Sequence, residues 1–439
     1  MEILIKASQF ILSLSFLIVL HELGHFIPAK LFKTRVEKFY LFFDYKFSLF
    51  KKKIGETVYG IGWIPLGGYV NIAGMIDESM DTEQLKQPAQ PWEFRSKPAW
   101  QRLIIMLGGV IVNFILGILI YIMITFVWGV EFVKPNDVKN GFAVDETFKA
   151  YGFKDGDKIL KFNGTEPEDV TDVNKHLFLR DVKSLEVLHE DGNTETINLP
   201  ENIGNIMWQN GVMEPFVPRI NPVIDTVITN SPAEKAGLLK NDKILAFNNT
   251  PINYWHEFTT SVLKNTENTF NLTIERDGEQ KNFTLTPNSD KKIGIAPNQI
   301  KNLNIQTKKY SFIESISKGN SLAIWTLKDY IKQFKYVFTK KGAKSIGGFI
   351  AIGNIFPPSW SWKAFWGITA FLSIMLGFMN LLPIPALDGG HVVFTLFEMI
   401  TGRKPNDKFL EYAQITGFII LLGLLILANG NDIVKLFSK

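Results

Sequence analysis

The chain has 439 residues, a formal net charge of +4 and no cysteine. This length leaves room for about two to four domains, and so small a net charge argues against nucleic acid as a partner. Without cysteine the chain has neither disulfides nor thiolate metal ligands, so a bound metal must be held by histidine and carboxylate.

Four stretches are long and apolar enough to cross a membrane as helices, which takes about 20 residues each. They cover residues 3–32, 103–128, 364–387 and 412–431. The second and fourth are too uniformly apolar to be the buried helices of a soluble domain. No small-residue cleavage site precedes the motif in the first stretch, which therefore predicts an uncleaved signal-anchor.

The first apolar stretch contains the motif HELGH at residues 21–25. On a helix this spacing places His21 and His25 one turn apart on the same face, as two ligands of Zn²⁺ require. Glu22 between them is the usual general base for the attacking water. One histidine on an apolar face is usually a packed, hydrogen-bonded residue. Two imidazoles and a carboxylate in a membrane segment are costly unless they are paired or bind a metal, so we expect a zinc site inside the bilayer.

A catalytic zinc site needs a third protein ligand and one open position. Asp388 follows two prolines in the stretch NLLPIPALDGGH at residues 380–391, where the backbone must be irregular. Irregular backbone at membrane depth is tolerated where it lines a cavity. Two alternatives are that His391 is the ligand, or that Asp388 is a helix N-cap just outside the membrane. We favour Asp388 as ligand because it completes a set of two histidines and one carboxylate.

The connection after the first stretch is rich in lysine, including residues 51–53, so the positive-inside rule places it in the cytoplasm. The middle of the chain would then lie on the other side of the membrane. Within the connection, residues 59–71 alternate β-favouring residues with glycine and proline, which predicts a hairpin or an edge strand. An edge strand beside a protease site can hold an extended substrate through backbone hydrogen bonds. An ordinary turn is the alternative.

The middle of the chain contains an internal repeat, because residues 152–163 align with residues 237–248, each pair 85 positions apart. Two copies of one domain explain this pattern, each with a turn, a strand of sequence Lys-Ile-Leu-x-Phe and a helical stretch. Residues 311–340 then show apolar residues at helical spacing between lysines. This pattern suits an amphipathic helix at a membrane interface or a helix packed on its neighbouring domain.

These motifs, in this order, resemble the bacterial site-2 protease family, and within it the regulator of sigma-E protease type with two PDZ domains. The resemblance covers nearly the whole chain and implies a general base, Glu22, and metal ligands, His21, His25 and Asp388. It also implies substrate-binding residues, which are Asn380, Asn113 in the second span, and Gly67, Gly68 and Tyr69 on the edge strand.

The resemblance implies a multi-span α-helical membrane protein with four transmembrane helices, a membrane-associated β-hairpin or edge strand, and two PDZ-like, mostly-β domains between the second and third helices. The implied activity is that of an intramembrane zinc metalloendopeptidase. It would cut single-pass transmembrane proteins of the anti-sigma factor type, or signal-peptide remnants, in the lipid bilayer of the bacterial inner membrane. The active site would lie towards the cytoplasm and the PDZ domains in the periplasm.

The two repeats differ in how well they match a PDZ domain. Residues 230–238 of the second copy match the family pattern, whereas the first copy lacks its Ser-Pro-Ala element. The repeats could bind peptides or act only as a size filter that excludes bulky ectodomains.

The expected parts follow one another along the chain. They are a first transmembrane helix with HExxH (1–32), a cytoplasmic loop with the edge strand (33–102), a second transmembrane helix (103–128), a first PDZ-like domain (129–215), a second (216–300), a linker with an amphipathic helix (301–363), a third transmembrane helix with LDGG (364–390), a cytoplasmic connection (391–411) and a fourth transmembrane helix (412–431).

Two other functions fit parts of the sequence. A membrane scaffold that holds partners through its repeats has no need for both metal motifs. A transporter would use the intramembrane histidines and aspartate as a pathway, but four spans without inverted repeats argue against it.

Overall fold

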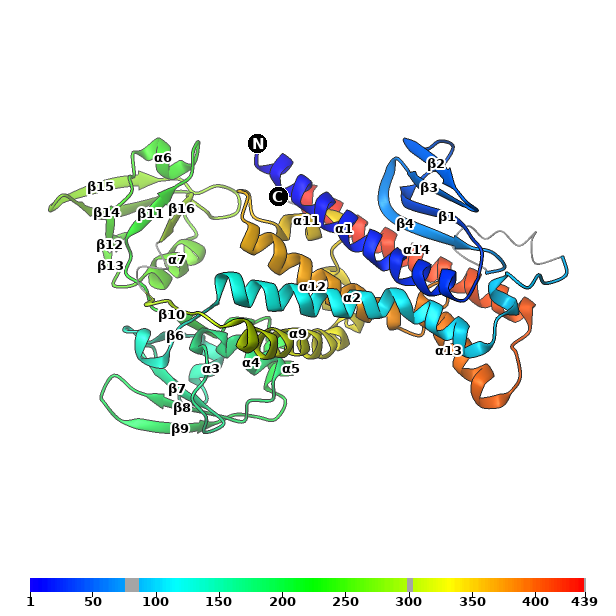
Figure 1. The fold of residues 1–439 in the computed structure, drawn as a ribbon. Coiled ribbons are helices and arrows are strands. Elements are labelled where there is room, and N and C mark those ends of the chain that lie inside the picture. Colours follow the sequence, from blue (N-terminus) through cyan, green and yellow to red (C-terminus); the bar gives the residue numbers. More distant parts are fainter. Residues whose placement is uncertain (76–86, 298–302, 438–439) are drawn as a thin grey trace. The chain divides into compact units, whose positions relative to one another are not determined.

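The computed structural model describes residues 1–75, 87–297 and 303–437, and the chain forms two compact units. One unit joins Met1–Gly129 to Lys309–Ser438, and the other is Val130–Lys308 (Figure 1). The first unit contains long apolar helices from both ends of the chain, and the second is rich in β-strands. The predicted fold class is therefore confirmed, with a β-rich region inserted between two pairs of helices.

Within the described residues, four helices are long and apolar enough to cross a membrane. They are α1 (Glu2–Leu31), α2 (Ala99–Trp128), α12 (Trp362–Leu381) and α14 (Asp407–Phe437). Many large apolar side chains of these helices are exposed, as expected of surfaces that face lipid. The third apolar stretch is divided. Helix α12 ends at Leu381, before the two prolines, and α13 (Asp388–Thr401) begins after them.

Helices α1 and α2 cross with their backbones in contact, and glycine makes this crossing possible. A Cβ atom on Gly24 would lie 2.5 Å from the carbonyl oxygen of Gly108, and one on Gly108 would overlap the carbonyl oxygen of Gly24. Small residues allow such close approach between membrane helices. The glycine of the HELGH motif therefore sets how closely α2 approaches the two histidines.

Helix α9 (Phe312–Phe334) lies against α2 through its smallest residues. Its buried residues are Ser315, Gly319 and Ala323, which are spaced four apart on one face. A Cβ atom on Gly319 would lie 2.5 Å from the backbone nitrogen of Ile122. The sequence left open what this helix packs on, and the structure answers that it packs on a membrane-spanning helix. Three short helices follow it, and these are η5 (Lys335–Phe338), α10 (Lys340–Ser345) and α11 (Phe349–Ile355).

A four-stranded sheet follows α1 in the order β2-β3-β1-β4. Its strands are β1 (Val36–Phe43), β2 (Phe50–Ile54), β3 (Thr57–Ile61) and β4 (Ile64–Ile72). Strand β4 is antiparallel to β1 and lies at the edge of the sheet. Of the segment 59–71 that predicted a hairpin or an edge strand, residues 64–71 form this edge strand, and residues 59–61 belong to the inner strand β3. A short helix, η2 (Phe94–Ser96), precedes α2.

The second unit has two hydrophobic cores, one built from residues 133–216 and one from residues 224–293. The three-stranded sheet β7-β8-β9 belongs to the first core and the four-stranded sheet β13-β12-β14-β15 to the second. The two repeated sequences form equivalent strands, β7 (Lys158–Phe162) and β12 (Lys243–Phe247), as predicted.

The remaining elements of this unit are short strands and helices. The strands are β5 (Val130–Phe132), β6 (Phe142–Val144), β8 (Ser184–Leu188), β9 (Thr194–Asn198), β10 (Phe216–Pro218), β11 (Ile224–Val227), β13 (Thr250–Pro251), β14 (Phe270–Arg276), β15 (Glu279–Leu285), β16 (Ile295–Pro297) and β17 (Gln306–Lys308). The helices are η3 (Pro135–Asp137), α3 (Glu146–Lys149), η4 (Val170–Asp172), α4 (Val173–Leu179), α5 (Ile203–Asn210), α6 (Pro232–Ala236) and α7 (Trp255–Lys264).

Both repeats bury an aspartate in the turn before the shared strand, but they pair it with different cations. Asp242 receives two hydrogen bonds of 2.7 Å from the guanidinium of Arg276. Asp157, its counterpart, lies 2.7 Å from Nδ1 of the buried His189, whose Nε2 lies 3.1 Å from a carboxylate oxygen of Glu195. Hydrogen bonds to Asp157 and then to Glu195 raise the pKa of His189 above its ordinary 6.5. Only the first repeat thus contains a titratable cation at this place.

We predict that the stability of the first repeat depends on pH. The pKa of His189 is raised in the folded state, so its protonation stabilises the folded repeat. This stabilisation is fully present below the ordinary pKa of 6.5 and is lost as the pH rises through the folded-state pKa. Native-state hydrogen exchange, corrected for intrinsic rates, should therefore show a lower opening free energy for β8 at about pH 8.5 than at about pH 6.

Strand β14 of the second repeat is the internal control, because arginine remains protonated throughout this range. His189→Gln should remove the pH dependence of β8. Equal opening free energies of β8 at both pH values in the unchanged protein would contradict the prediction.

Candidate metal centre and active site

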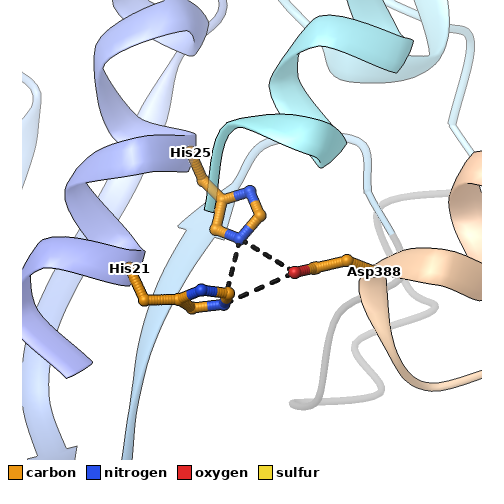
Figure 2. Close-up of side chains that lie close together, drawn as sticks. All are labelled: His21, His25 and Asp388. Carbon is orange, nitrogen blue, oxygen red and sulfur yellow. Dashed lines mark hydrogen bonds and ion pairs between the residues drawn. The ribbon is translucent and has the colours of Figure 1, made fainter. Parts of the chain in front are cut away.

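Two histidines of α1 and the aspartate at the start of α13 converge on one point. The Nε2 atoms of His21 and His25 are 3.3 Å apart. Oδ2 of Asp388 lies 3.4 Å from Nε2 of His21 and 3.3 Å from Nε2 of His25 (Figure 2). Residues 367 positions apart in sequence thus present three donor atoms as a nearly equilateral triangle.

This triangle fits a tetrahedral zinc ion. Zinc binds imidazole nitrogen and carboxylate oxygen at about 2.0–2.2 Å, which places neighbouring tetrahedral donors about 3.3–3.5 Å apart. All three observed separations match this spacing. Oδ2 of Asp388 is also buried without a hydrogen-bond partner among the described residues, which is unfavourable for a carboxylate oxygen unless a cation is bound there. The donor set therefore suits Zn²⁺ and leaves the fourth position open.

The backbone of α2 fixes the orientation of the His25 ring. Nδ1 of His25 lies 2.8 Å from the carbonyl oxygen of Ile105, and the ring is buried. A carbonyl oxygen can only accept a hydrogen bond, so Nδ1 carries the proton and the lone pair of Nε2 points to the metal position. Metal-binding histidines commonly donate their other ring N–H to a backbone carbonyl in this way, which fixes the tautomer and the ring orientation.

Two asparagines from other helices contact His21. The side-chain amide of Asn113 on α2 lies 3.1 Å from Nδ1, and that of Asn380 at the end of α12 lies 3.3 Å from Nε2. For Nε2 to bind a metal, Nδ1 must donate its proton, and the acceptor is then Oδ1 of Asn113. That oxygen is otherwise buried without a partner in the described chain. Exchanging the positions of the amide oxygen and nitrogen of Asn113 lets Oδ1 accept the Nδ1–H of His21 and satisfies both groups. The orientation of an asparagine amide is assigned from its hydrogen-bond partners.

Gly109 of α2 leaves the space that the two imidazoles occupy. A Cβ atom at this position would overlap Nε2 of His25 and lie 2.6 Å from Cε1 of His21. No other residue type can stand here without moving a metal-binding ring. Its neighbour Gly108 permits the close helix crossing described above, so consecutive glycines serve two different contacts.

The segment that carries Asp388 is held by α14. Ala386 has a positive φ of 80°, an unusual conformation for a residue with a side chain. Its backbone N–H donates to Oε1 of Gln414, at 3.2 Å, and Gln414 is buried. A Cβ atom on Gly417 would overlap the carbonyl oxygen of Pro385. The fourth membrane helix thus fixes a strained turn immediately before the third donor.

A cavity of about 470 Å³ opens beside the three donors. Glu22 lines it, together with residues of β4 from Gly68 to Ile72, including Tyr69. A Cβ atom on Gly68 would lie 2.5 Å from the side chain of Ile18 and 3.7 Å from Cγ of Glu22. Gly67 precedes it on the same strand, where a Cβ atom would lie 2.8 Å from the ring of Phe43. The absence of a side chain at Gly68 thus allows the edge strand to approach the HELGH helix, and its absence at Gly67 leaves room for the ring of Phe43.

The structure brings every residue singled out in the sequence to this region. His391 lines the cavity, but the group of three possible donors is His21, His25 and Asp388. Sequence reasoning missed Gln414, the carbonyl of Ile105 and the steric role of Gly109. A glutamine within the otherwise apolar fourth stretch was a signal for the first, whereas a backbone carbonyl leaves no signal in the sequence.

Comparison with known proteins agrees with this site. A family model described as peptidase family M50 matches residues 9–424. The chain is 30% identical over 467 residues to the regulator of sigma E protease of Haemophilus influenzae, with 99% of this chain and 100% of that protein covered. It is 29% identical over 455 residues to the regulator of sigma-E protease RseP of Escherichia coli, with 98% of each covered. A Pasteurella multocida protein named "putative zinc metalloprotease" is 30% identical over 456 residues, with 99% and 100% covered.

We predict that Gly109→Ala reduces zinc affinity more than it reduces stability. The added methyl group displaces the imidazoles, whereas the helix itself gains a better helix former. The chelator concentration at which the purified protein loses half of its zinc should be at least about tenfold lower for the variant. This corresponds to ~1.4 kcal/mol of zinc-binding free energy.

Gly423→Ala in α14 is the matched control, because a Cβ atom there meets nothing within 4 Å. Equal zinc retention by the two variants would contradict the proposed closeness of Gly109 to the metal-binding rings.

Proposed function

The chain belongs to peptidase family M50 and is a membrane zinc metalloprotease of the regulator of sigma-E protease type. We propose below which residues carry out the reaction and which proteins the enzyme cuts. His21, His25 and Asp388 hold the zinc ion, and Glu22 is the general base. The observation that carries this proposal is the triangle of donor atoms at tetrahedral spacing, with Glu22 in the wall of the same cavity.

Different residues of the chain have different roles in the hydrolysis of a peptide bond. Zinc, when bound, polarises the scissile carbonyl and lowers the pKa of water. Glu22 accepts the proton of the attacking water and passes it to the nitrogen of the leaving amine. Asn380 and Asn113 lie within hydrogen-bond distance of His21. Their proposed role is substrate binding, with the amide of Asn380 donating a hydrogen bond to a substrate carbonyl.

Strand β4 offers the substrate a backbone edge. It is the last strand of its sheet, and its residues from Gly68 to Ile72 line the cavity. A helical substrate hides its carbonyls in its own hydrogen bonds, so the segment to be cut must unwind. Pairing of the unwound segment with β4 restores the lost backbone hydrogen bonds. Gly67, Gly68 and Tyr69 thereby bind substrate next to Glu22.

The proposed substrates are single-pass transmembrane proteins of the anti-sigma factor type and signal-peptide remnants. The cytoplasmic side is assigned to the end of α1 that carries the motif, because the lysine-rich connection to α2 follows it. The β-rich unit, with its two PDZ-like repeats, would then lie on the periplasmic side of the inner membrane. Its proposed role is a size filter that keeps bulky ectodomains from the active site.

Glu22→Gln tests the assignment of the base. Glutamine keeps the shape of the side chain but cannot accept the proton of water, so cleavage of a single-pass substrate with a trimmed ectodomain should fall by at least about 10²-fold while zinc remains bound. His21→Ala, in contrast, should lose both zinc and cleavage. Equal cleavage by Glu22→Gln and the unchanged enzyme, both loaded with zinc, would contradict the assignment.

Removal of the β-rich unit tests the size filter. Strands β5 and β17 pair with each other, Val130 opposite Lys308, so the two ends of the unit lie close together and a short glycine linker can replace residues 130–308. We expect the shortened enzyme to cut substrates with a folded ectodomain as well as trimmed ones, whereas the full chain cuts only the trimmed form. If both enzymes discriminate equally, the unit is not the filter. The shortened enzyme with Glu22→Gln controls for contaminating proteases.

A further inference from the structure

A carboxylate that the reaction does not use lies in the wall of the active-site cavity. Asp44 follows strand β1 and lines the cavity together with Glu22 and Asp388. Its Oδ1 accepts a hydrogen bond of 2.9 Å from the hydroxyl of Tyr69, and its Oδ2 accepts one of 3.3 Å from Ser48. Both donors are neutral. In the described parts of the chain, Asp44 forms no ion pair with lysine, arginine or histidine.

The position of Asp44 is fixed by a stack of aromatic rings. The ring of Tyr69 lies parallel to that of Tyr40, with centroids 5.3 Å apart, and nearly parallel to that of Phe43, with centroids 6.0 Å apart. The hydroxyl of Tyr40 lies 3.2 Å from Oγ of Ser48, the second residue that donates to Asp44. Contacts within the protein therefore hold the carboxylate of Asp44 in place. Since Tyr69 belongs to β4, Asp44 is held by the strand that faces the substrate.

The other charged side chains of this wall differ from Asp44. Glu37 forms an ion pair of 3.9 Å with Arg35. Nζ of Lys38 lies 6.0 Å from the centroid of the Tyr69 ring. A carboxylate has about four positions at which it can accept hydrogen bonds, and two are used in Asp44. A half-buried negative charge with free acceptor positions attracts a cation more strongly than an exposed one.

We propose that Asp44 determines substrate specificity by binding a lysine or arginine side chain close to the scissile bond. This inference rests on the proposed function. The cytoplasmic flanks of single-pass proteins are rich in lysine and arginine, and the cavity lies at the end of α1 assigned to the cytoplasm. Their long side chains can cross an apolar surface and place the charged group at a distant partner. The edge strand would thus set the register of the substrate, and Asp44 would select the side chain at one position.

The test is the ratio of kcat/KM for two substrates that differ at one residue. A single-pass substrate with a trimmed ectodomain carries either lysine or glutamine at each position in turn within three residues of the cleaved bond. With the full-length, zinc-loaded enzyme we expect one position at which lysine is preferred about tenfold, as charge pairs at partly desolvated interfaces give. Asp44→Asn should reduce this preference to about one. A third substrate, with glutamate at that position, should be preferred over the glutamine substrate by Asp44→Lys.

Glu37→Gln is the matched control, because it removes the same charge from the same cavity wall but from a residue that is already paired. It should keep the preference for lysine. An unchanged preference in Asp44→Asn, or its equal loss in Glu37→Gln, would overturn the role of Asp44. No lysine preference at any position would also overturn it while leaving the protease intact. Absence of all cleavage by the unchanged enzyme, with every substrate, would instead contradict the proposed function.

Discussion

Two imidazoles and one carboxylate lie inside a membrane-spanning unit, and the rest of the structure depends on how the cost of burying them is compensated. His25 and Asn113 are buried, and the oxygen Oδ2 of Asp388 has no hydrogen-bond partner in the described chain. Polar groups in such surroundings destabilise a fold unless each finds a partner. One tetrahedral metal ion satisfies all three donors at the spacing observed. The remaining polar atoms are satisfied by a backbone carbonyl and by asparagine amides. A metal ion bound here would thus both serve the proposed reaction and compensate the buried donor atoms.

Close packing of helices follows from this requirement. Helix α2 passes very near α1 beside the two histidines, and Gly24, Gly108 and Gly109 lack the side chains that would prevent it. The third donor follows an interruption of the helix, because α12 ends at Leu381 and α13 begins at Asp388. Two prolines end that helix, and α14 holds the resulting turn through Gln414 and Gly417. All four membrane-spanning helices thus contribute to the position of one ion.

The sheet next to α1 supplies the strand that we propose as the backbone partner of the substrate. Membrane interiors lack water to hydrogen-bond an unwound peptide, so a protease there must provide backbone partners of its own. Strand β4 lies at the edge of its sheet and shares a cavity wall with Glu22, so the proposed strand addition and the proposed proton transfer would take place in one cavity. The aromatic stack of Tyr40, Tyr69 and Phe43 gives the wall of the cavity a fixed shape and holds Asp44 within it. Backbone pairing and side-chain selection can then act on the same substrate segment.

The four membrane-spanning stretches, the repeat and the pair of histidines can be recognised without a structure, because hydrophobic length, a period of 85 residues and a spacing of four are properties of the amino-acid order. The sequence also predicted that Asp388 joins the histidines, by chemical completeness. Three features are visible only in the folded chain. Strand β4 lies at an edge beside Glu22, α9 packs on α2, and Gln414, Gly109 and the carbonyl of Ile105 support the residues that would bind the metal. Those contacts join residues far apart in sequence, and a glycine or a carbonyl has the same appearance in a sequence whether or not another helix touches it. Asp44 is the clearest example, since its meaning depends on Tyr69 and Ser48 donating to it and on no cation in the described chain pairing with it.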